Sequence, residues 1–255
     1  MKNPVIDKDL TQLLKQCERE ELEPIVGIIL SSPSQTLTVQ PAYRDHQGDH
    51  LRYVDEIVYE ITSFGGNSLA NLVRGQGIPY AEMVRDVAAK LGLKPAITDS
   101  LSMLEGKILL RIIKLAYDRL DEEDRLALQD LLELSDGLDE NGEFPEEEIS
   151  RQLATAGTSL MGDRIQNAIG IAARSAKFRQ AINGIIKAGI AKLAMAGLGG
   201  PVSWAVAAGQ ALYDLFGPNY TIAIGLVAQI GLLRQKYEQM GRDMVARDIE
   251  AELVE

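Results

Sequence analysis

The sequence predicts an all-α protein, a bundle of amphipathic helices around an apolar helical hairpin near the C-terminus. Leu, Ile and Ala recur at spacings of three and four along most of the chain, which is typical of helices. No segment shows the strict alternation of a half-buried strand. Of the 255 residues, 46% are hydrophobic and only 5% aromatic, which is enough apolar material for a sizeable core.

The distribution of charge divides the chain into three regions. We predict an N-terminal helical region over residues 1–120, an acidic connector over 121–150, and a C-terminal bundle over 151–255 that contains the apolar hairpin, residues 189–233. Residues 121–148 hold thirteen acids and one base, a local charge of −12, so they account for the net charge of −11 and the rest of the chain is about neutral. Between Arg151 and Lys192 seven bases stand against one acid. This uneven distribution of charge argues against a protein that binds duplex nucleic acid, and it suits contact with an anionic membrane surface or an acidic partner.

The first 65 residues show the clearest helix boundaries. Residues 7–21 predict one helix with Asp7 as N-cap, and Pro24 predicts a boundary that starts a second short helix. Residues 31–49 read as a loop or extended arm rich in turn formers. Residues 50–63 predict an amphipathic helix whose apolar stripe consists of Leu51, Val54, Ile57, Val58 and Ile61.

Glycines and prolines mark the later boundaries. The helix before Gly65-Gly66 ends there, a short helix follows from residue 67 or 68, and another starts at Pro79 after the break at residues 75–77. Further helices are expected at 101–120, 125–134 and, after Pro145, from 146 to about 195. We expect these glycines to stop helices and permit close packing, because neither a preceding strand nor a following Lys-Ser/Thr pair supports a phosphate cradle.

Reaction chemistry is poorly represented. His46 and His50 have a spacing that metal ligands use, but Gly48 lies between them, so a solvated loop is the favoured interpretation. Asp139, Asn141 and Glu148 fit a calcium loop whose first position is Gly137 instead of an acid, which favours an ordinary acidic turn. A single cysteine, Cys17, suits a reducing cytoplasm. We therefore expect no cofactor and no enzymatic activity.

Several short blocks form a recognisable set: Asp9-Leu10 with Cys17, Glu60, the run from Phe64 to Asn71, Arg74-Gly75-Gln76-Gly77, Tyr80, Asp86-Val87, Leu91, and the segment from GLGGPV at 197–202 to Arg234. Together they resemble the bacterial YaaW family, which is known mainly without an assigned activity. The family is grouped more distantly with the ubiquinol-cytochrome c chaperone family. The resemblance implies a helical fold, no prosthetic group and a role beside a membrane, but it transfers no catalytic residue.

The same blocks suggest a polar cluster. Asn67 or Ser68 can cap a helix that carries Asn71 and Arg74, which would meet Glu60 and Asp86. The cluster is either a buried latch between helices, which we favour, or a docking surface for a carboxylate or phosphate.

The apolar hairpin raises the question of membrane contact. Residues 193–213 and 215–233 lack charged side chains, but GLGGP interrupts the first run and the second helix is expected to begin near Pro218. A fully buried core hairpin and a membrane-active hairpin are about equally supported. In the second case the contact residues are basic and aromatic: Arg174, Lys177, Arg179, Lys187, Lys192, Trp204, Tyr213 and Tyr220.

We therefore expect a non-enzymatic cytoplasmic protein, peripheral at the inner membrane, whose hairpin contacts the membrane or a membrane-protein partner in pore formation or assembly. The alternative is a soluble chaperone or adaptor with the hairpin permanently in its core and a protein client. No nucleic-acid partner is expected, and oligomerisation stays open.

Overall fold

The structure is a computed structural model that describes residues 7–65, 77–117 and 218–252, and all regular secondary structure in these ranges is helical. Its elements are α1 (Lys8–Gln16), α2 (Arg19–Ser31), η1 (Leu37–Val39), α3 (Pro41–Asp45), η2 (His50–Tyr53), α4 (Val54–Gly65), α5 (Tyr80–Lys90), α6 (Leu101–Tyr117) and α12 (Pro218–Glu252). The all-α prediction is confirmed for this part of the chain. The predicted 189–217 part of the hairpin lies outside the described residues.

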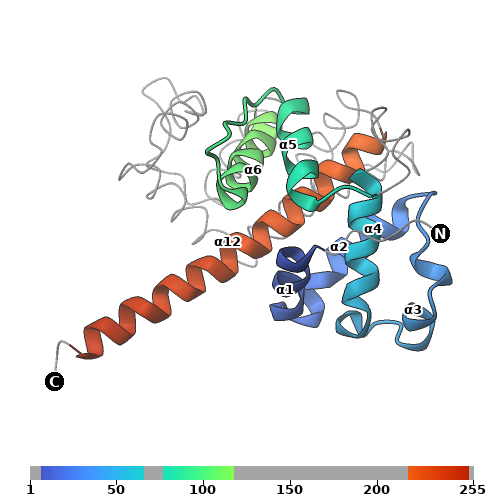
Figure 1. Cartoon of the computed structure of the whole chain (residues 1–255), viewed down its shortest axis with the longest axis horizontal. Helices are drawn as coiled ribbons and strands as arrows, with labels where there is room; N and C mark the ends of the chain where they lie inside the picture. The colour runs from blue at the N-terminus through green and yellow to red at the C-terminus, as the bar shows by residue number, and fades with distance from the viewer. Residues whose placement is uncertain (1–6, 66–76, 118–217, 253–255) are drawn as a thin grey trace.

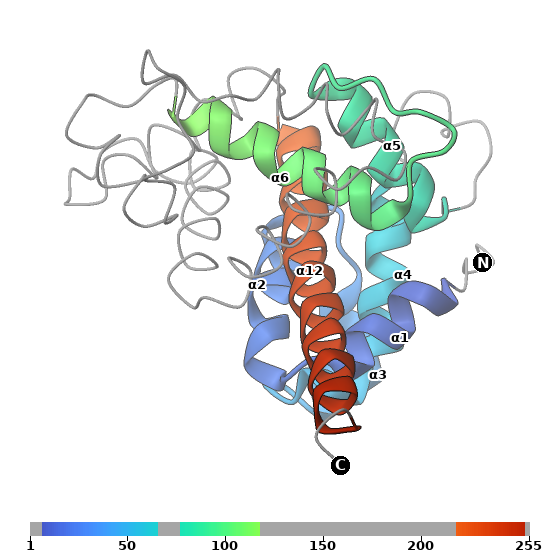
Figure 2. The same cartoon turned by 90° about the vertical axis from the view of Figure 1, so that its left-hand side faces the viewer.

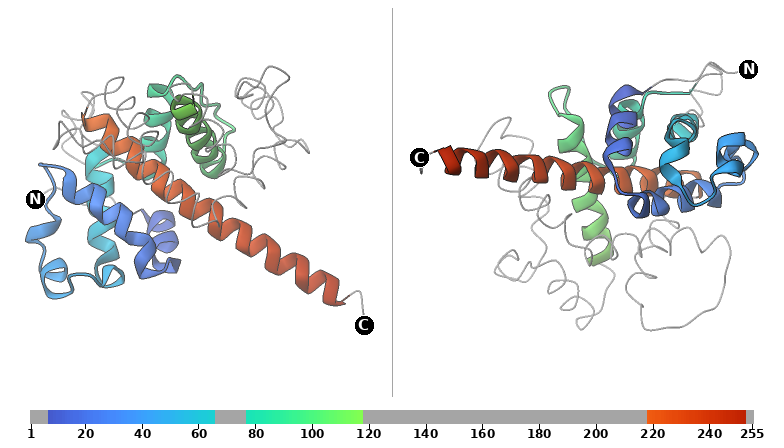
Figure 3. Two further views of the ribbon diagram at one scale, coloured as in Figure 1. Left: turned by 180° about the vertical axis from the view of Figure 1, so that it is seen from behind. Right: turned by 90° about the horizontal axis from the view of Figure 1, so that it is seen from below.

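The long helix α12 is the axis of the fold. Its first half runs between the N-terminal helices α1–α4 on one side and the α5–α6 pair on the other, and its C-terminal half extends beyond both (Figures 1 and 2). Views from behind and from below show α6 crossing α12 near its middle (Figure 3). Helices from the predicted N-terminal region and the predicted C-terminal region therefore share one core.

The N-terminal boundaries are partly as predicted. Asp7 caps α1, because its carboxylate accepts a hydrogen bond from Leu10 N at 3.0 Å. The single helix expected over residues 7–21 is wrong, since Cys17 and Glu18 have extended backbones and α2 begins at Arg19. Glu18 N donates to the Glu21 side chain at 3.2 Å, a capping interaction that starts a new helix there.

The predicted boundary at Pro24 is also wrong, because Pro24 lies inside α2. The helix keeps this proline although it removes one backbone hydrogen bond. Burial of apolar side chains offsets the lost hydrogen bond, because the neighbouring Leu22, Ile25, Val26 and Ile29 all lie in the core.

Residues 32–53 contain more structure than the predicted loop. Two short 3₁₀ helices and α3 lie here, and His50 is buried instead of solvated. Its Nδ1 bonds to the Tyr53 hydroxyl and its Nε2 to Glu23 Oε2 at 2.5 Å, whereas His46 is exposed. In the helix predicted over 50–63, four of the five stripe residues are buried, but Leu51 falls in the 3₁₀ turn and is exposed.

The glycine and proline boundaries agree with the structure where it describes them. α4 ends at Gly65, Pro79 is the N-cap of α5, and α12 begins at Pro218. At Gly77 a Cβ atom would lie 2.9 Å from the Thr62 carbonyl oxygen, and Ile78 N donates to the same oxygen at 3.0 Å. This glycine therefore permits close packing against α4, as predicted.

The second apolar run forms the centre of the core. All residues from 221 to 235 except Ala223 are buried, which is the pattern of a helix that is covered on all sides. Within the described ranges no helix combines the length and the apolar content needed to cross a bilayer.

Candidate functional site

A buried ion pair joins α6 to α12. Arg234 Nε donates to Glu105 Oε2 at 2.8 Å, and the Glu105 side chain is fully buried. The Tyr80 hydroxyl of α5 donates to the other carboxylate oxygen at 2.8 Å. The helices meet closely here because Gly231 has no side chain; a Cβ atom at this position would lie 3.0 Å from the Glu105 Cβ.

The N-terminus of α1 completes the arrangement. Arg234 Nη2 lies 3.0 Å from Asp9 Oδ2, so the guanidinium bridges a buried and an exposed carboxylate. Asp7, the N-cap of α1, also accepts from Tyr80 N at 2.9 Å and thereby ties the start of α5 to α1. The helices α1, α5, α6 and α12 thus share one polar network.

Burial dominates the electrostatics of Glu105. Desolvation raises the pKa of this carboxyl from 4.5 to about 7, although Arg234 and the Tyr80 hydroxyl both favour the ionised form. The pKa of Tyr80 is raised well above its usual value by burial and by the adjacent Glu105. For Arg234, burial lowers the pKa, but Glu105, Tyr80 and Asp9 outweigh it and the net shift is upward. Glu105 is therefore a buried group that can exchange a proton near neutral pH.

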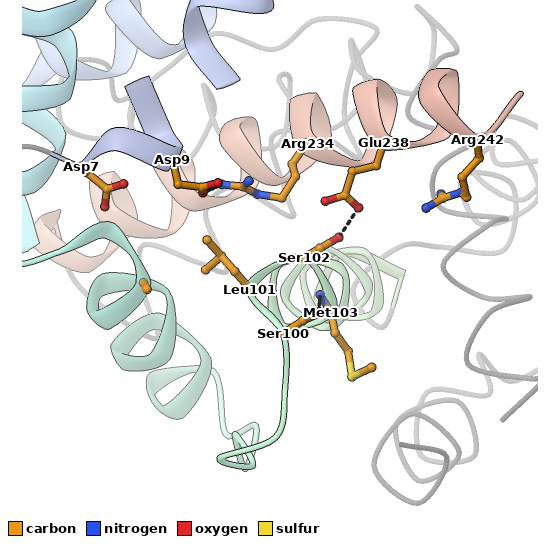
Figure 4. Close-up of a pocket in the computed structure, with 10 residues that line it drawn as sticks. Asp7, Asp9, Ser100, Leu101, Ser102, Met103, Arg234, Glu238 and Arg242 are labelled. Carbon is orange, nitrogen blue, oxygen red and sulfur yellow. Dashed lines mark hydrogen bonds and ion pairs between the residues drawn. The ribbon is translucent and has the colours of Figure 1, made fainter. Parts of the chain in front are cut away.

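A cavity of about 650 Å³ opens beside this network (Figure 4). The first turns of α5 and α6 and the start of α1 border it, and α12 forms its far wall. Its lining residues are Asp7, Asp9, Ala81, Ser100, Leu101, Ser102, Met103, Arg234, Glu238 and Arg242. A smaller hollow of about 220 Å³ shares Asp9, Arg234 and Glu238 with it. We call the two together the Arg234 cavity.

Most polar groups of the Arg234 cavity have partners. The Ser102 hydroxyl donates to Glu238 Oε2 at 2.7 Å and accepts from Gln235 Nε2 at 2.8 Å. Ser100 Oγ accepts from Met103 N at 3.1 Å and so caps α6. Arg242 Nη2 donates to the Gln239 side-chain oxygen at 2.7 Å.

The chemistry available here is recognition of charged groups. Among the described residues that line the cavity there is no histidine or cysteine, and Glu105 lies behind it with both oxygens engaged. Within the described ranges no group of three or more His, Cys, Asp or Glu side chains could hold a metal ion.

A second polar cluster fixes α12 to α2. The Tyr237 hydroxyl donates to Glu21 Oε2 at 2.7 Å, and Lys236 Nζ bonds to Glu21 Oε1. Burial raises the pKa of Glu21, but the hydrogen bonds from Lys236 and Tyr237 outweigh it and lower the pKa below the usual value. α12 therefore has polar anchors to α1, α2 and α6 within one turn, at Arg234, Gln235 and Lys236.

The predicted cluster around Glu60 is only partly visible. Glu60 is buried and accepts from both the backbone N and the hydroxyl of Thr36. Asp86 is exposed on α5, with a pKa raised by partial burial and by Glu82. The other members, Asn67, Ser68, Asn71 and Arg74, lie outside the described residues.

Of the predicted contact residues, Tyr220 is half-buried near the start of α12, and Lys90 Nζ lies 4.7 Å from its ring centre. The remaining predicted contact residues lie outside the described ranges: Arg174, Lys177, Arg179, Lys187, Lys192, Trp204 and Tyr213. The residues of the possible calcium loop, Asp139, Asn141 and Glu148, also lie outside them.

The sequence analysis missed Glu105 and Arg234 as a site. The sequence does contain a signal for this site, namely charged residues beside apolar ones. Glu105 lies next to the apolar stripe formed by Leu104, Ile108 and Ile112, and Arg234 directly follows the uncharged run. Asp9, Tyr80 and Arg234 are also among the residues that carry the family resemblance.

Comparison with known proteins gives relatives along nearly the whole chain. A Helicobacter pylori (strain J99) protein named UPF0174 protein is 24% identical over 257 residues, covering 96% of this chain and 98% of that protein. The UPF0174 protein YaaW of Escherichia coli O157:H7 is 27% identical over 244 residues, covering 91% and 96%. No family model and no solved structure matches.

Proposed function

We propose that this chain, which belongs to the UPF0174 family, is a non-enzymatic helical adaptor that binds a protein partner at the Arg234 cavity while α12 stays in the core. The names of its relatives state no activity. The membrane-contacting hairpin, which the sequence supports equally, becomes the second proposal.

The burial of α12 carries the first proposal. Residues 221–235 are enclosed by the other helices, and Arg234 is bound to Glu105 at their end. Moving this run to a lipid surface would separate Arg234 from Glu105 and Lys236 from Glu21. Separating a buried pair costs about 3–5 kcal/mol when a charge is left uncompensated. A permanent core role avoids this cost.

The Arg234 cavity supports binding in preference to catalysis. It combines charged side chains with the apolar walls of Leu101 and Met103, a mixture common at partner-binding surfaces. Its described lining residues contain one hydroxyl–carboxylate pair, Ser102 with Glu238 at 2.7 Å, but the same hydroxyl also accepts from Gln235, and no histidine or cysteine is among these residues to form the usual nucleophile–base pair.

Site-specific photo-crosslinking in cells tests this proposal. A photoreactive residue at Met103, inside the cavity, should capture one dominant protein, whereas the same residue at the exposed Leu51 on η2 should not. Equal capture patterns at the two positions would contradict an adaptor site at the cavity.

The second proposal is an amphitropic protein whose second apolar run reaches the inner membrane. It is supported by the absence of charged side chains from residue 218 to 233 and by the basic segment that precedes the hairpin. Flotation with anionic liposomes at acidic and neutral pH separates the two proposals. The adaptor should stay in the soluble fraction, while co-flotation of the intact chain would favour the membrane role.

A further inference from the structure

The guanidinium of Arg234 has binding capacity on its cavity side. A guanidinium carries five N–H donors, of which Nε is used by Glu105. Nη2 is buried and makes no hydrogen bond beyond its ion pair with Asp9. The Arg234 side chain is only 9% exposed, whereas that of Asp9 is 65% exposed. The cavity-side partner of a deeply buried cation is thus an exposed surface carboxylate that another carboxylate could replace.

The cavity lining carries two guanidinium groups, Arg234 and Arg242, and three carboxylates, Asp7, Asp9 and Glu238, so an incoming anion has to displace one of these carboxylates. The first turn of α6 borders the cavity without an acidic residue of its own, and backbone N–H groups at helix starts favour negative charge. Arg242 adds a second guanidinium, which is bound to a neutral amide oxygen. Asp7 and Glu238 keep their charge but are held in place by hydrogen bonds, because Asp7 accepts from two backbone N–H groups and Glu238 accepts from Ser102. Asp9 is therefore the carboxylate most readily displaced.

The shape indicates a chain segment. The two hollows share Asp9, Arg234 and Glu238, so a ligand can extend from one to the other past the guanidinium. Leu101 and Met103 offer apolar contacts along the larger hollow. An extended peptide with carboxylate side chains matches this arrangement better than a compact anion.

We propose that the Arg234 cavity docks an acidic peptide segment of a partner protein, and that docking is coupled to proton uptake by Glu105. This inference rests on the proposed adaptor function and names the chemistry of the partner.

The coupling follows from the groups that face Glu105. Tyr80 on α5 and Arg234 and Glu238 on α12 act on it directly, while Asp9 and Asp7 at the start of α1 contact Arg234 and Tyr80. An acidic segment in the cavity would exclude water and add negative charge close to Arg234, and both effects disfavour a second negative charge on Glu105. Since the pKa of Glu105 is already about 7, a small further rise causes proton uptake near neutral pH.

Isothermal titration calorimetry with two end-capped peptides, tetraglutamate and tetraglutamine, tests the proposal on the full chain. We expect the tetraglutamate peptide to bind at least about tenfold more tightly than tetraglutamine. Its affinity should fall up to about tenfold from about pH 6.5 to about pH 8, as Glu105 ionises. Titrations in two buffers of different ionisation enthalpy should show uptake of a fraction of a proton, and Glu105→Gln should abolish both the uptake and the pH dependence.

Two charge-matched variants separate docking from general attraction. Asp9→Asn removes the competing carboxylate and should tighten tetraglutamate binding several-fold. Asp55→Asn removes an exposed acid on α4, outside the cavity, and should leave the affinity almost unchanged.

Three results would each overturn the proposal: equal binding of the two peptides, equal effects of the two variants, or undiminished proton uptake in Glu105→Gln. A partner that crosslinks at Met103 through a segment without acidic residues would overturn this inference and leave the adaptor function standing.

Discussion

Glu105→Gln should change how the stability of the protein depends on pH. The pKa of Glu105 is about 7 in the folded protein and 4.5 for an ordinary glutamate, so folding takes up a proton between these values. The stability that protonated Glu105 contributes is fully present below pH 4.5 and is lost as the pH rises through 7. A shift of this size corresponds to about 3 kcal/mol at about 1.4 kcal/mol per pKa unit.

Glutamine cannot titrate, so its effect is a fixed cost. The Tyr80 hydroxyl and Arg234 Nε both donate to Glu105, and an amide offers only one oxygen acceptor for the two. Below about pH 7 the protonated carboxyl has nearly the same limit, so the cost of the amide relative to it is that of one neutral hydrogen bond, about 0.5–1.5 kcal/mol. We therefore expect the variant to be less stable than the original protein at about pH 5, and the difference to disappear or reverse at about pH 8.

Urea unfolding of both proteins at several values between about pH 5 and about pH 8, followed by circular dichroism, measures this difference while the titration of all other groups cancels. A difference in unfolding free energy that stays constant with pH, or that grows toward the alkaline end, would refute the reasoning. Tyr80→Phe provides an internal check. It removes a hydrogen bond that lowers the pKa of Glu105, so the pH transition should move to higher pH.

Three further changes test the packing around this network. Gly231→Ala should cost about 1–3 kcal/mol in thermal unfolding, because its Cβ would press on Glu105, whereas Gly241→Ala in the same helix meets nothing within 4 Å and should be neutral or stabilising. Asp99→Asn should cost about 3–5 kcal/mol in urea unfolding, since it leaves buried Lys107 without its counterion at 3.0 Å; a loss below about 1 kcal/mol would contradict a buried pair. Cys17, with a pKa raised to about 12 mainly by burial, should react with a thiol reagent at about pH 8 only in urea, and rapid labelling of the folded protein would contradict its burial.

Helix boundaries were predictable wherever one residue has a dominant local role. Asp7 as N-cap, Pro79 before α5 and Pro218 at the start of α12 all follow from capping preferences and the fixed backbone of proline. The boundary between α1 and α2 was not predictable in this way, because the sequence fits a continuous helix as well as a new helix that starts with the Glu18–Glu21 capping interaction. Pro24 misled the prediction in the opposite direction, since burial of its neighbours outweighs its local preference.

The candidate site was harder to predict because its partners are far apart in sequence. Arg234 and Glu105 are separated by 129 residues, and nothing local to either indicates that they pair. His50 shows the same limitation: its loop reads as solvated, yet Glu23 and Tyr53 enclose it through tertiary packing. A charged residue on an otherwise apolar stripe predicts that a partner exists, but the identity of the partner comes only from the fold.

The choice between core and membrane illustrates the same point. An uncharged helical run has one pattern whether protein or lipid surrounds it, so residues 215–233 could not decide between the two. The distinguishing residues stand just after the run. A helix that leaves the core easily would have end residues satisfied by water, whereas Arg234, Gln235, Lys236 and Tyr237 are bonded to α6 and α2. Because these four anchors must break together, a membrane role for α12 requires a partner or lipid contact that offsets all of them, and the adaptor role requires none.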